Sequence, residues 1–314
     1  MTCHDCNTQC KKFGKNRKGT QRFQCRQCRK TFSESNTLNG MYTPLDKAAQ
    51  VLQLLLEGCS VNSTARLADI HHTTILSLLS VAGEKCERLL DSRVRNVPVT
   101  DVQCDEIWGY VGKKEQNKWM DEAHRKDLGD AYTFVAIERH SKLVLAFHLG
   151  RRDQASTTAF VGKLRNATTD QRFQITTDGF QAYPSAIDYA LIDRCDYAQL
   201  VKVYASPREG EARYSPADVV GAVPTPVMGN PDKDRICTSH VERQNLTMRM
   251  QLRRLTRLTN AFSKKWANLK AALAVYFAWY NFCRVHKTLR MTPAMAAGIA
   301  DHIWTIPELL GAAA

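Results

Sequence analysis

The chain has 314 residues, of which 44% are hydrophobic and 24% are charged, a balance typical of a globular protein. No apolar run approaches the ~20 residues of a membrane-spanning helix, and the basic N-terminus lacks the apolar core of a secretory signal. We therefore expect a cytoplasmic protein that does not associate with membranes.

The formal net charge of +13 is concentrated in two stretches. Residues 1–32 carry nine Lys or Arg and a single acid, and residues 243–290 carry eleven Lys or Arg and no acid. Such clustering indicates a polyanionic partner. Nucleic acid is favoured over a membrane surface because neither stretch has the amphipathic pattern of an interfacial helix. A DNA partner would associate the protein with the nucleoid.

Five of the eleven cysteines lie within the first 28 residues, and four of them form two Cys-x2-Cys pairs. The pairs are Cys3 with Cys6 and Cys25 with Cys28. Four thiolates at this spacing close a tetrahedral zinc site, so residues 1–35 are predicted to form a zinc ribbon around Phe13, Phe23 and Phe32. The zinc would supply much of the folding energy of so small a core. Cys10 is a bystander thiol, a substitute ligand or a redox-active thiol.

Residues 44–95 have helical periodicity. Asp46 lies near the start of a first helix that Gly58 ends, and Ser60 is positioned to cap a short second helix. A third helix is expected over residues 73–82, followed by a linker helix over 81–95 that leads to a boundary at Val97-Pro98.

The order of these helices predicts a helix-turn-helix. The start of its third helix is polar, and a helix in that position reads base edges in the major groove. The residues concerned are His71, His72, Thr73, Thr74 and Ser77. The alternative is a small helical bundle with a solvated polar edge, because basic residues are sparse here.

From residue 99 the pattern changes to strands over 102–111, 132–138 and 143–149. Asp153 is positioned to cap a helix, and a strand over 173–177 and further helices and strands follow in alternation. This order predicts an α/β fold of the ribonuclease-H-like kind, a mixed sheet flanked by helices, over residues 99–295, with a C-terminal tail over 296–314.

Residues 205–235 are rich in proline and lack periodicity, so they are expected to form a loop insertion. It could act as a lid, a DNA clamp or a dimer contact.

Three acidic residues stand out from their surroundings. Asp105 lies in an apolar strand, Asp178 follows a second apolar strand, and Glu242 lies near the start of a basic helix. A carboxylate on an apolar strand is costly unless a cation or hydrogen bonds satisfy it, so the three acids are candidate metal ligands. The competing interpretations are a turn residue for Asp178 and a helix-dipole contact for Glu242. Strand alternation lets only one of Asp105 and Glu106 face the site, and we expect Asp105.

Several basic residues flank Glu242. His240 could orient a phosphate or cap the helix, and Arg249 returns to the helix face of Glu242 after two turns, where it would contact DNA. Arg253, Arg254 and Arg257 are expected on the same helix as phosphate contacts or as a solvated face. The next helix, from Trp266 to Tyr280, has the apolar spacing of a core helix.

Taken in order, these features resemble the DDE transposases of bacterial insertion sequences, most closely the insertion-sequence-one family. The resemblance is carried by the zinc pairs, the helix-turn-helix, CDEIWGYV at 104–111, TDGFQAY at 177–183, HVERQN at 240–245, WYNF at 279–282, and then Arg284, His286, Lys287, Leu289 and the run 292–294.

The resemblance implies that Asp105, Asp178 and Glu242 bind two Mg²⁺ or Mn²⁺ ions for strand cleavage and transfer on double-stranded DNA. It also implies recognition of terminal inverted repeats by a dimer or larger assembly, because two element ends are cut in concert. The alternatives are a related integrase or nuclease, and a zinc-ribbon DNA-binding regulator whose catalytic-like domain is inert.

Overall fold

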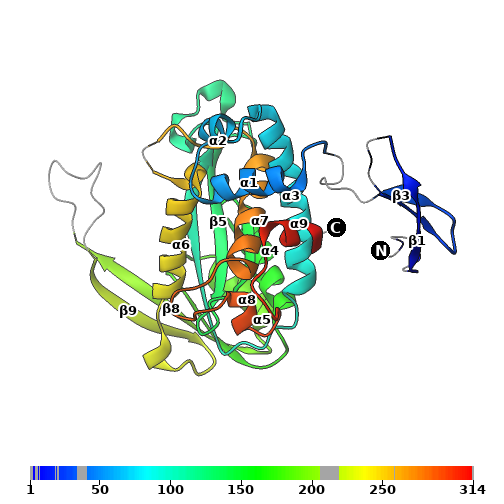
Figure 1. Cartoon of the computed structure of the whole chain (residues 1–314). Coiled ribbons are helices and arrows are strands. Elements are labelled where there is room, and N and C mark those ends of the chain that lie inside the picture. Colours follow the sequence, from blue (N-terminus) through cyan, green and yellow to red (C-terminus); the bar gives the residue numbers. More distant parts are fainter. Residues whose placement is uncertain are drawn as a thin grey trace. The chain divides into compact units, whose positions relative to one another are not determined.

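The structure is a computed structural model that describes residues 3, 6, 8–17, 19, 21–33, 41–205, 219–257 and 259–312. The chain divides into two compact units, residues 1–49 and 50–314 (Figure 1). Within the described ranges, no helix is long and apolar enough to cross a lipid bilayer.

The first unit contains a small antiparallel sheet of β1 (Cys10–Lys15), β2 (Gln21–Cys25) and β3 (Thr31–Ser33). Phe23 is buried and stacks on Phe32 with ring centroids 6.3 Å apart. Phe13 was expected in this core, but 43% of its surface is exposed and its ring contacts the Arg22 guanidinium instead. An apolar core this small needs further cross-linking to be stable.

Three helices follow, α1 (Leu45–Leu56), α2 (Val61–Ala68) and α3 (His72–Arg93). The predicted cap of α2 is confirmed, because the Ser60 side chain accepts a hydrogen bond from the Ser63 amide. The third helix and the linker helix were predicted separately, yet they form one continuous helix, α3. Its N-cap is His71, whose side chain accepts from the Thr73 amide.

Helix α3 lies alongside α7 (Trp266–Phe282), and the contact depends on a glycine (Figure 1). A Cβ atom at Gly83 would lie 2.5 Å from the Cα atom of Ala271, so the two backbones are closer than any side chain allows. The predicted core character of α7 is confirmed, since nearly every residue from Leu269 onward is buried.

The large sheet has the strand order β6-β5-β4-β7-β8-β9. Its strands are β4 (Asp101–Val111), β5 (Gly129–Glu138), β6 (Val144–Gly150), β7 (Phe173–Thr177), β8 (Cys195–Tyr204) and β9 (Val219–Met228). β4, β5 and β6 are antiparallel neighbours, β7 is parallel to β4, and β8 is parallel to β7. The parallel pair β4–β7 brings residues from two distant parts of the chain side by side.

Helices cover both faces of this sheet. On one face, Phe160 of α4 (Gln154–Ala167) packs on Phe134 of β5, and Tyr183 of α5 (Tyr183–Leu191) packs on Phe160. On the other face, Phe147 of β6 packs on Phe277 of α7. The result is a mixed α/β arrangement of three layers, with a six-stranded sheet in the middle.

The prediction of a loop over residues 205–235 is wrong for part of that segment, because residues 219–228 form β9, which pairs antiparallel with β8. Pro224 and Pro226 lie within this strand, and such prolines are tolerated because β9 is at the edge of the sheet. Residues 206–218 lie outside the described residues.

Helix α6 (Ser239–Gln251) is the predicted basic helix, but it is shorter than expected. The backbone leaves the helix at Leu252, and Arg253 and Arg254 lie in a separate 3₁₀ turn, η4 (Arg253–Leu255). The remaining elements are η1 (Glu115–Asn117), η2 (Met120–Glu122), η3 (Lys233–Arg235), α8 (Pro293–Ala296) and α9 (Ile306–Ala312).

The close approach at Gly83 predicts that Gly83→Ala destabilises the protein by about 1–3 kcal/mol, because the added methyl group collides with the α7 backbone. Gly162→Ala in α4 is the matched control: its Cβ would meet nothing within 4 Å, and it should be neutral or stabilising by up to about 1 kcal/mol. Thermal unfolding of both variants measures this. Equal stability of Gly83→Ala and wild type would contradict the steric explanation.

Candidate functional site

Asp105, Asp178 and Glu242 line one cavity of 610 Å³, which we call the acidic pocket. They come from three elements, the middle of β4, the residue after β7 and the first turn of α6. The parallel register pairs Cys104 with Thr177. The residues that follow this pair, Asp105 on β4 and Asp178 directly after β7, therefore lie close together. Three acids far apart in the sequence therefore converge on one space.

Two of these acids form a tight cluster with a third carboxylate, that of Glu106. One carboxylate oxygen from each of Asp105, Glu106 and Asp178 lies within 4.8 Å of the others. Burial, and then the negative charge of Asp178, raise the pKa of Asp105 to about 7, and Glu242 adds to this effect. The same two causes raise the pKa of Glu106 to about 7. Oxygen donors that repel one another in this way fit a divalent cation such as Mg²⁺.

Glu242 lines the same pocket, but its carboxylate is held by protein groups. Lys202 on β8 approaches its Oε1 atom at 2.6 Å, and the Thr238 hydroxyl donates to the same oxygen. The ammonium group compensates the charge of Glu242, so this carboxylate stays ordered beside the cluster.

Glu106 was expected to be a solvated or supporting group, and the structure gives it a closer role. Its side chain is only 2% exposed and accepts a hydrogen bond from Arg152 Nε at 3.2 Å. Its Oε1 atom has no hydrogen-bond partner among the described residues. Glu106 does point to the opposite face of β4 from Asp105, as alternation predicts, but both flank the end of β7, where Asp178 lies.

Arg152 is a site residue that sequence reasoning missed. Its guanidinium contacts both Glu106 and Asp178, the latter at 3.4 Å, and lies over the ring of Phe180. The only sequence signal was its position directly before Asp153, the confirmed cap of α4.

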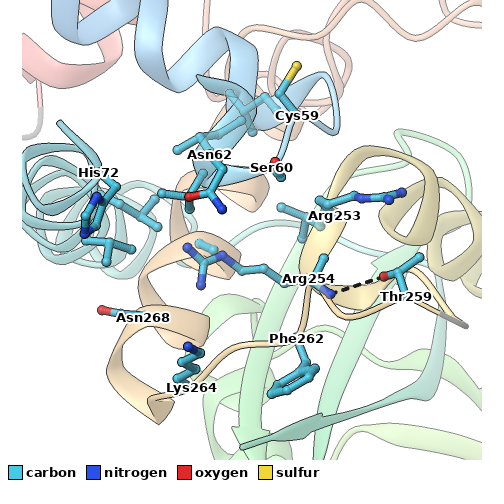
Figure 2. Close-up of a pocket in the computed structure, with 18 of the residues that line it drawn as sticks. Cys59, Ser60, Asn62, His72, Arg253, Arg254, Thr259, Phe262, Lys264 and Asn268 are labelled. Atoms are coloured by element: carbon cyan, nitrogen blue, oxygen red, sulfur yellow. Dashed lines mark hydrogen bonds between the residues drawn. The ribbon is translucent and has the colours of Figure 1, made fainter. Parts of the chain in front are cut away.

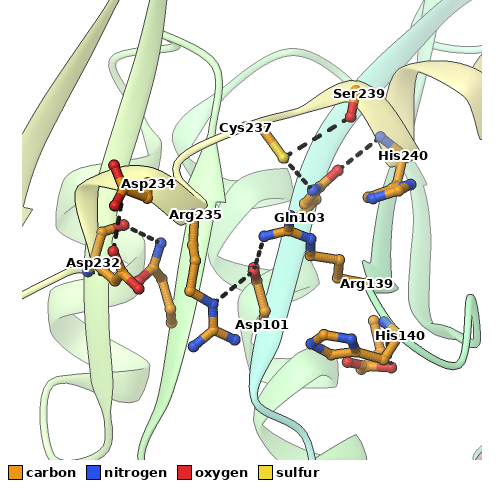
Figure 3. A network of polar contacts seen from close by, with 12 residues as sticks. Asp101, Gln103, Arg139, His140, Asp232, Asp234, Arg235, Cys237, Ser239 and His240 are labelled. Carbon is orange, nitrogen blue, oxygen red and sulfur yellow. Dashed lines mark hydrogen bonds and ion pairs between the residues drawn. The ribbon is translucent and has the colours of Figure 1, made fainter.

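Gln103 determines where α6 begins. This residue is fully buried on β4, two positions before Asp105 and on the same face. Its side-chain carbonyl accepts hydrogen bonds from the amides of His240 at 2.9 Å and Val241 at 3.2 Å (Figure 3). The residue that precedes α6, Thr238, makes no side-chain cap of its own. A tertiary contact from β4 therefore replaces the usual local cap.

The segment that precedes α6 is anchored by two more buried side chains. Asp101, also on β4, is paired with Arg139 at 3.0 Å and Arg235 at 3.5 Å (Figure 3). Gln174 on β7 exchanges two hydrogen bonds with the backbone of Asp232. The strands that carry Asp105 and precede Asp178 thus also hold the approach to Glu242.

The structure does not bring Arg249 or His240 into the acidic pocket. Arg249 donates to the backbone carbonyls of Leu255 at 2.9 Å and Trp108 at 3.1 Å, and so ties η4 to β4. His240 lies on a different side of α6, with its Nδ1 atom 3.2 Å from Lys142 Nζ.

The predicted DNA-contacting residues are only partly brought together. His72, Arg253 and Arg254 line a cavity of 490 Å³ between the end of α1, α2, α3, η4 and α7, and Lys264 lines it too (Figure 2). Arg254 Nη1 donates to Ser263, and burial lowers the Arg254 pKa to about 10. The other predicted residues do not line this cavity. They are Thr73 and Ser77 on the exposed side of α3, Thr74, which is half-buried, and Arg257, which is exposed.

In the first unit, Cys3, Cys6, Cys25 and Cys28 each place a sulfur within 4.8 Å of the others. The amides of Gln27 and Cys28 donate to the Cys25 sulfur, and these bonds contribute to lowering the Cys25 pKa to about 6. Four thiols with this geometry are compatible with a zinc site. Cys10 is not in the cluster, and its thiol faces the Thr8 carbonyl.

Comparison with known protein families gives a match over part of the chain. Residues 120–209 match a family model described as a DDE domain, that of IS240-type transposases, while no curated protein matches. The matched range contains Asp178, and Asp105 and Glu242 lie outside it. The match supports an insertion-sequence DDE transposase, and such a protein implies transposition, use of divalent metal ions and DNA binding. The mixed sheet flanked by helices fits the ribonuclease-H-like domain of a DDE transposase.

The cysteine cluster predicts that Cys25→Ser loses bound zinc and unfolds the first unit, because three thiolates bind the ion less tightly than four. Cys10→Ser is the matched control and should retain zinc. Metal content of the purified proteins measures both. Unchanged zinc in Cys25→Ser would contradict the assignment.

The cap on α6 predicts that Gln103→Leu destabilises the protein by about 1–3 kcal/mol, because two amides lose their acceptor. Hydrogen exchange of the His240 and Val241 amides should also accelerate. Gln171→Leu, at an exposed position, should change stability by less than about 0.5 kcal/mol. Unaltered exchange at both amides of Gln103→Leu would show that another group caps α6.

Proposed function

We propose that this protein is a DNA transposase that binds the terminal inverted repeats of an insertion sequence and cuts and joins DNA strands. The observation that carries the proposal is the convergence of Asp105, Asp178 and Glu242 on one pocket, in a chain whose residues 120–209 match a DDE domain. We also propose that its nearest relatives are the insertion-sequence-one family, on the sequence runs that resemble it.

Asp105, Asp178 and Glu242 would hold two Mg²⁺ or Mn²⁺ ions, and Glu106 is placed to assist because it lies in the same cluster. Bound ions supply positive charge for the attacking and leaving oxygens of a phosphoryl transfer. In the first reaction a water oxygen bonds to phosphorus and the element's 3′-oxygen leaves. In the second reaction that 3′-hydroxyl attacks a target phosphate, so each step forms and breaks one P–O bond.

The protein's own residues hold the acids in place and attract the substrate. Asn245 Nδ2 donates to Asp105 at 2.8 Å, which fixes that carboxylate relative to α6. Lys202 and Thr238 fix Glu242 in the same way. Arg152 and Lys202 are half-exposed cations at the pocket wall, where they favour entry of a phosphate.

Recognition of the element ends is assigned to the N-terminal half. The zinc ribbon of residues 1–35 and the helix-turn-helix of residues 44–95 would contact DNA, with His72, Thr73, Thr74 and Ser77 at base edges. Outside that half, Arg253, Arg254 and Arg257, which follow α6, would contact phosphates. Because two ends are cut together, a homodimer or larger assembly on nucleoid DNA is part of the proposal.

The test is cleavage and joining of a labelled element-end duplex with Mg²⁺. Wild type should cut, whereas Asp105→Asn, Asp178→Asn and Glu242→Gln should each lose at least about a hundredfold in rate while still binding DNA. Asp188→Asn, an exposed aspartate on α5, should cut like wild type.

A triad variant that keeps its rate is not a metal ligand, and Glu106→Gln then becomes the variant to compare. DNA binding without any cleavage by wild type on a verified end would favour an inert DNA-binding regulator.

A further inference from the structure

A second cavity, of 460 Å³, lies on another flank of α6 and is lined by many basic residues. Its cations are Lys142, Arg243, Arg284 and Lys287, accompanied by His240 and His286. The remaining lining residues are Ile137, Gln244, Thr247, Tyr280 and Thr288. We call it the basic pocket.

Three separate parts of the chain build this pocket. Lys142 comes from the turn between β5 and β6, and Arg284, His286 and Lys287 follow α7. Helix α6 contributes positions 240, 243, 244 and 247, which form one continuous stripe because residues three and four apart share a helix face. Glu242 and Asn245 lie off this stripe, toward the acids. One helix therefore separates the acidic pocket from the basic pocket.

The positive charge of the basic pocket has little compensation from the protein, because the carboxylate that acts most on it, Glu138 beside Lys142, does not line the pocket. None of its lining residues is acidic, and within the described ranges its four Lys and Arg side chains form no ion pair. By contrast, the cations of the acidic pocket, Arg152 and Lys202, are both paired with carboxylates. Burial, and then the charges of Lys142 and Arg284, lower the pKa of His286.

The pocket is also built to keep its cations in place. The Arg284 guanidinium lies over the rings of Trp279 and Tyr280, at 5.9 Å and 5.8 Å from their centroids. His286 and Met291 are bridged by a backbone hydrogen bond of 2.9 Å, which folds the segment that carries Lys287 into a turn. Lys142 Nζ donates to the Arg139 carbonyl. Like charges gathered around one space repel one another, and a bound anion would relieve that repulsion.

The hydrogen-bond donors of the basic pocket are side chains and not the backbone amides at the start of α6, because the amides of His240 and Val241 already donate to Gln103. Several cationic donors that converge on one space, with hydroxyl groups of Thr247 and Thr288 beside them, match the oxygens of a phosphate group.

We propose that the basic pocket binds a backbone phosphate of the DNA whose strand is processed in the acidic pocket, so that α6 is held between two phosphates of one DNA molecule. The proposal rests on the proposed function for its ligand. It assigns a role to Arg284 and Lys287, which the acidic pocket leaves unused.

The test compares the DNA binding of a double variant, Arg243→Gln with Lys287→Gln, with that of a control variant, Lys233→Gln. Both variants and their parent carry Asp178→Asn, so that no strand is cut. Arg243 and Lys287 are exposed at the pocket rim, so their replacement should leave the fold intact, and Lys233 is an exposed lysine outside the pocket. A plot of the logarithm of the DNA association constant against the logarithm of the salt concentration has a negative slope. We expect this slope to become shallower by about one for each phosphate that the double variant no longer neutralises, and to change little in Lys233→Gln.

A second arm locates the phosphate. Duplexes in which single phosphates are replaced by neutral methylphosphonates should bind wild type less tightly at one or two positions, and the double variant should be insensitive at those positions only. Arg284→Lys, which keeps the charge, should retain the wild-type pattern of sensitive positions.

Three outcomes separate the possibilities. Wild type that binds and cuts DNA, with the same salt slope and methylphosphonate pattern in the double variant, overturns the pocket assignment and leaves the proposed function intact. Saturable binding of inorganic phosphate at micromolar concentration, abolished in the double variant and without effect on DNA, identifies a free-anion site and also overturns it. Failure of wild type to bind any DNA overturns the proposed function itself.

Discussion

The arrangement of the site depends on one buried amide. Gln103 presents its carbonyl oxygen to the first turn of α6, and it lies on the strand that carries Asp105. Because a helix end buried without acceptors or donors is unstable, this contact fixes both the starting point and the direction of α6. Asn245 then closes the arrangement with a hydrogen bond from α6 to Asp105. The separation between Asp105 and Glu242 is thus set by rigid elements, as a site that positions reacting groups requires.

Charge is distributed across α6 in a way that the net charge alone does not reveal. Carboxylates gather on one side, where burial and mutual repulsion raise the pKa of Asp105, and cations with little compensation gather on the other. Each group is unfavourable by itself, since like charges in a partly buried space repel. Under the two proposals, metal ions in one pocket and a phosphate in the other would relieve both repulsions. The repulsion between like charges on each side of α6 would thus be linked to ligand binding on that side.

Local signals in the sequence predicted local structure well. Capping residues such as Ser60 and Asp153 marked helix starts, and apolar runs marked the strands, with β7 found at its observed bounds. The failures are non-local. β9 was missed because Pro224 and Pro226 favour a loop, and because this exposed edge strand is defined by its pairing with β8. Gln103 and Arg152 were missed because their partners are distant in the chain, and only the folded register brings Glu106 beside Asp178. Arg249 has the helix spacing of a residue that faces DNA, but α6 ends at Leu252 and the Arg249 guanidinium donates to the carbonyls of Leu255 in η4 and Trp108 in β4.

The contact at Gly83 has a geometric consequence for a DNA-bound complex. Helix α3 has 22 residues, which corresponds to about 33 Å, and its middle is locked against α7 at backbone distance. A helix held so closely can neither slide nor rotate about its axis. If the start of α3 reads bases as proposed, the position that is read and the position that is cut are fixed relative to each other. The fold would then set the number of base pairs between the sequence that α3 reads and the point of cleavage.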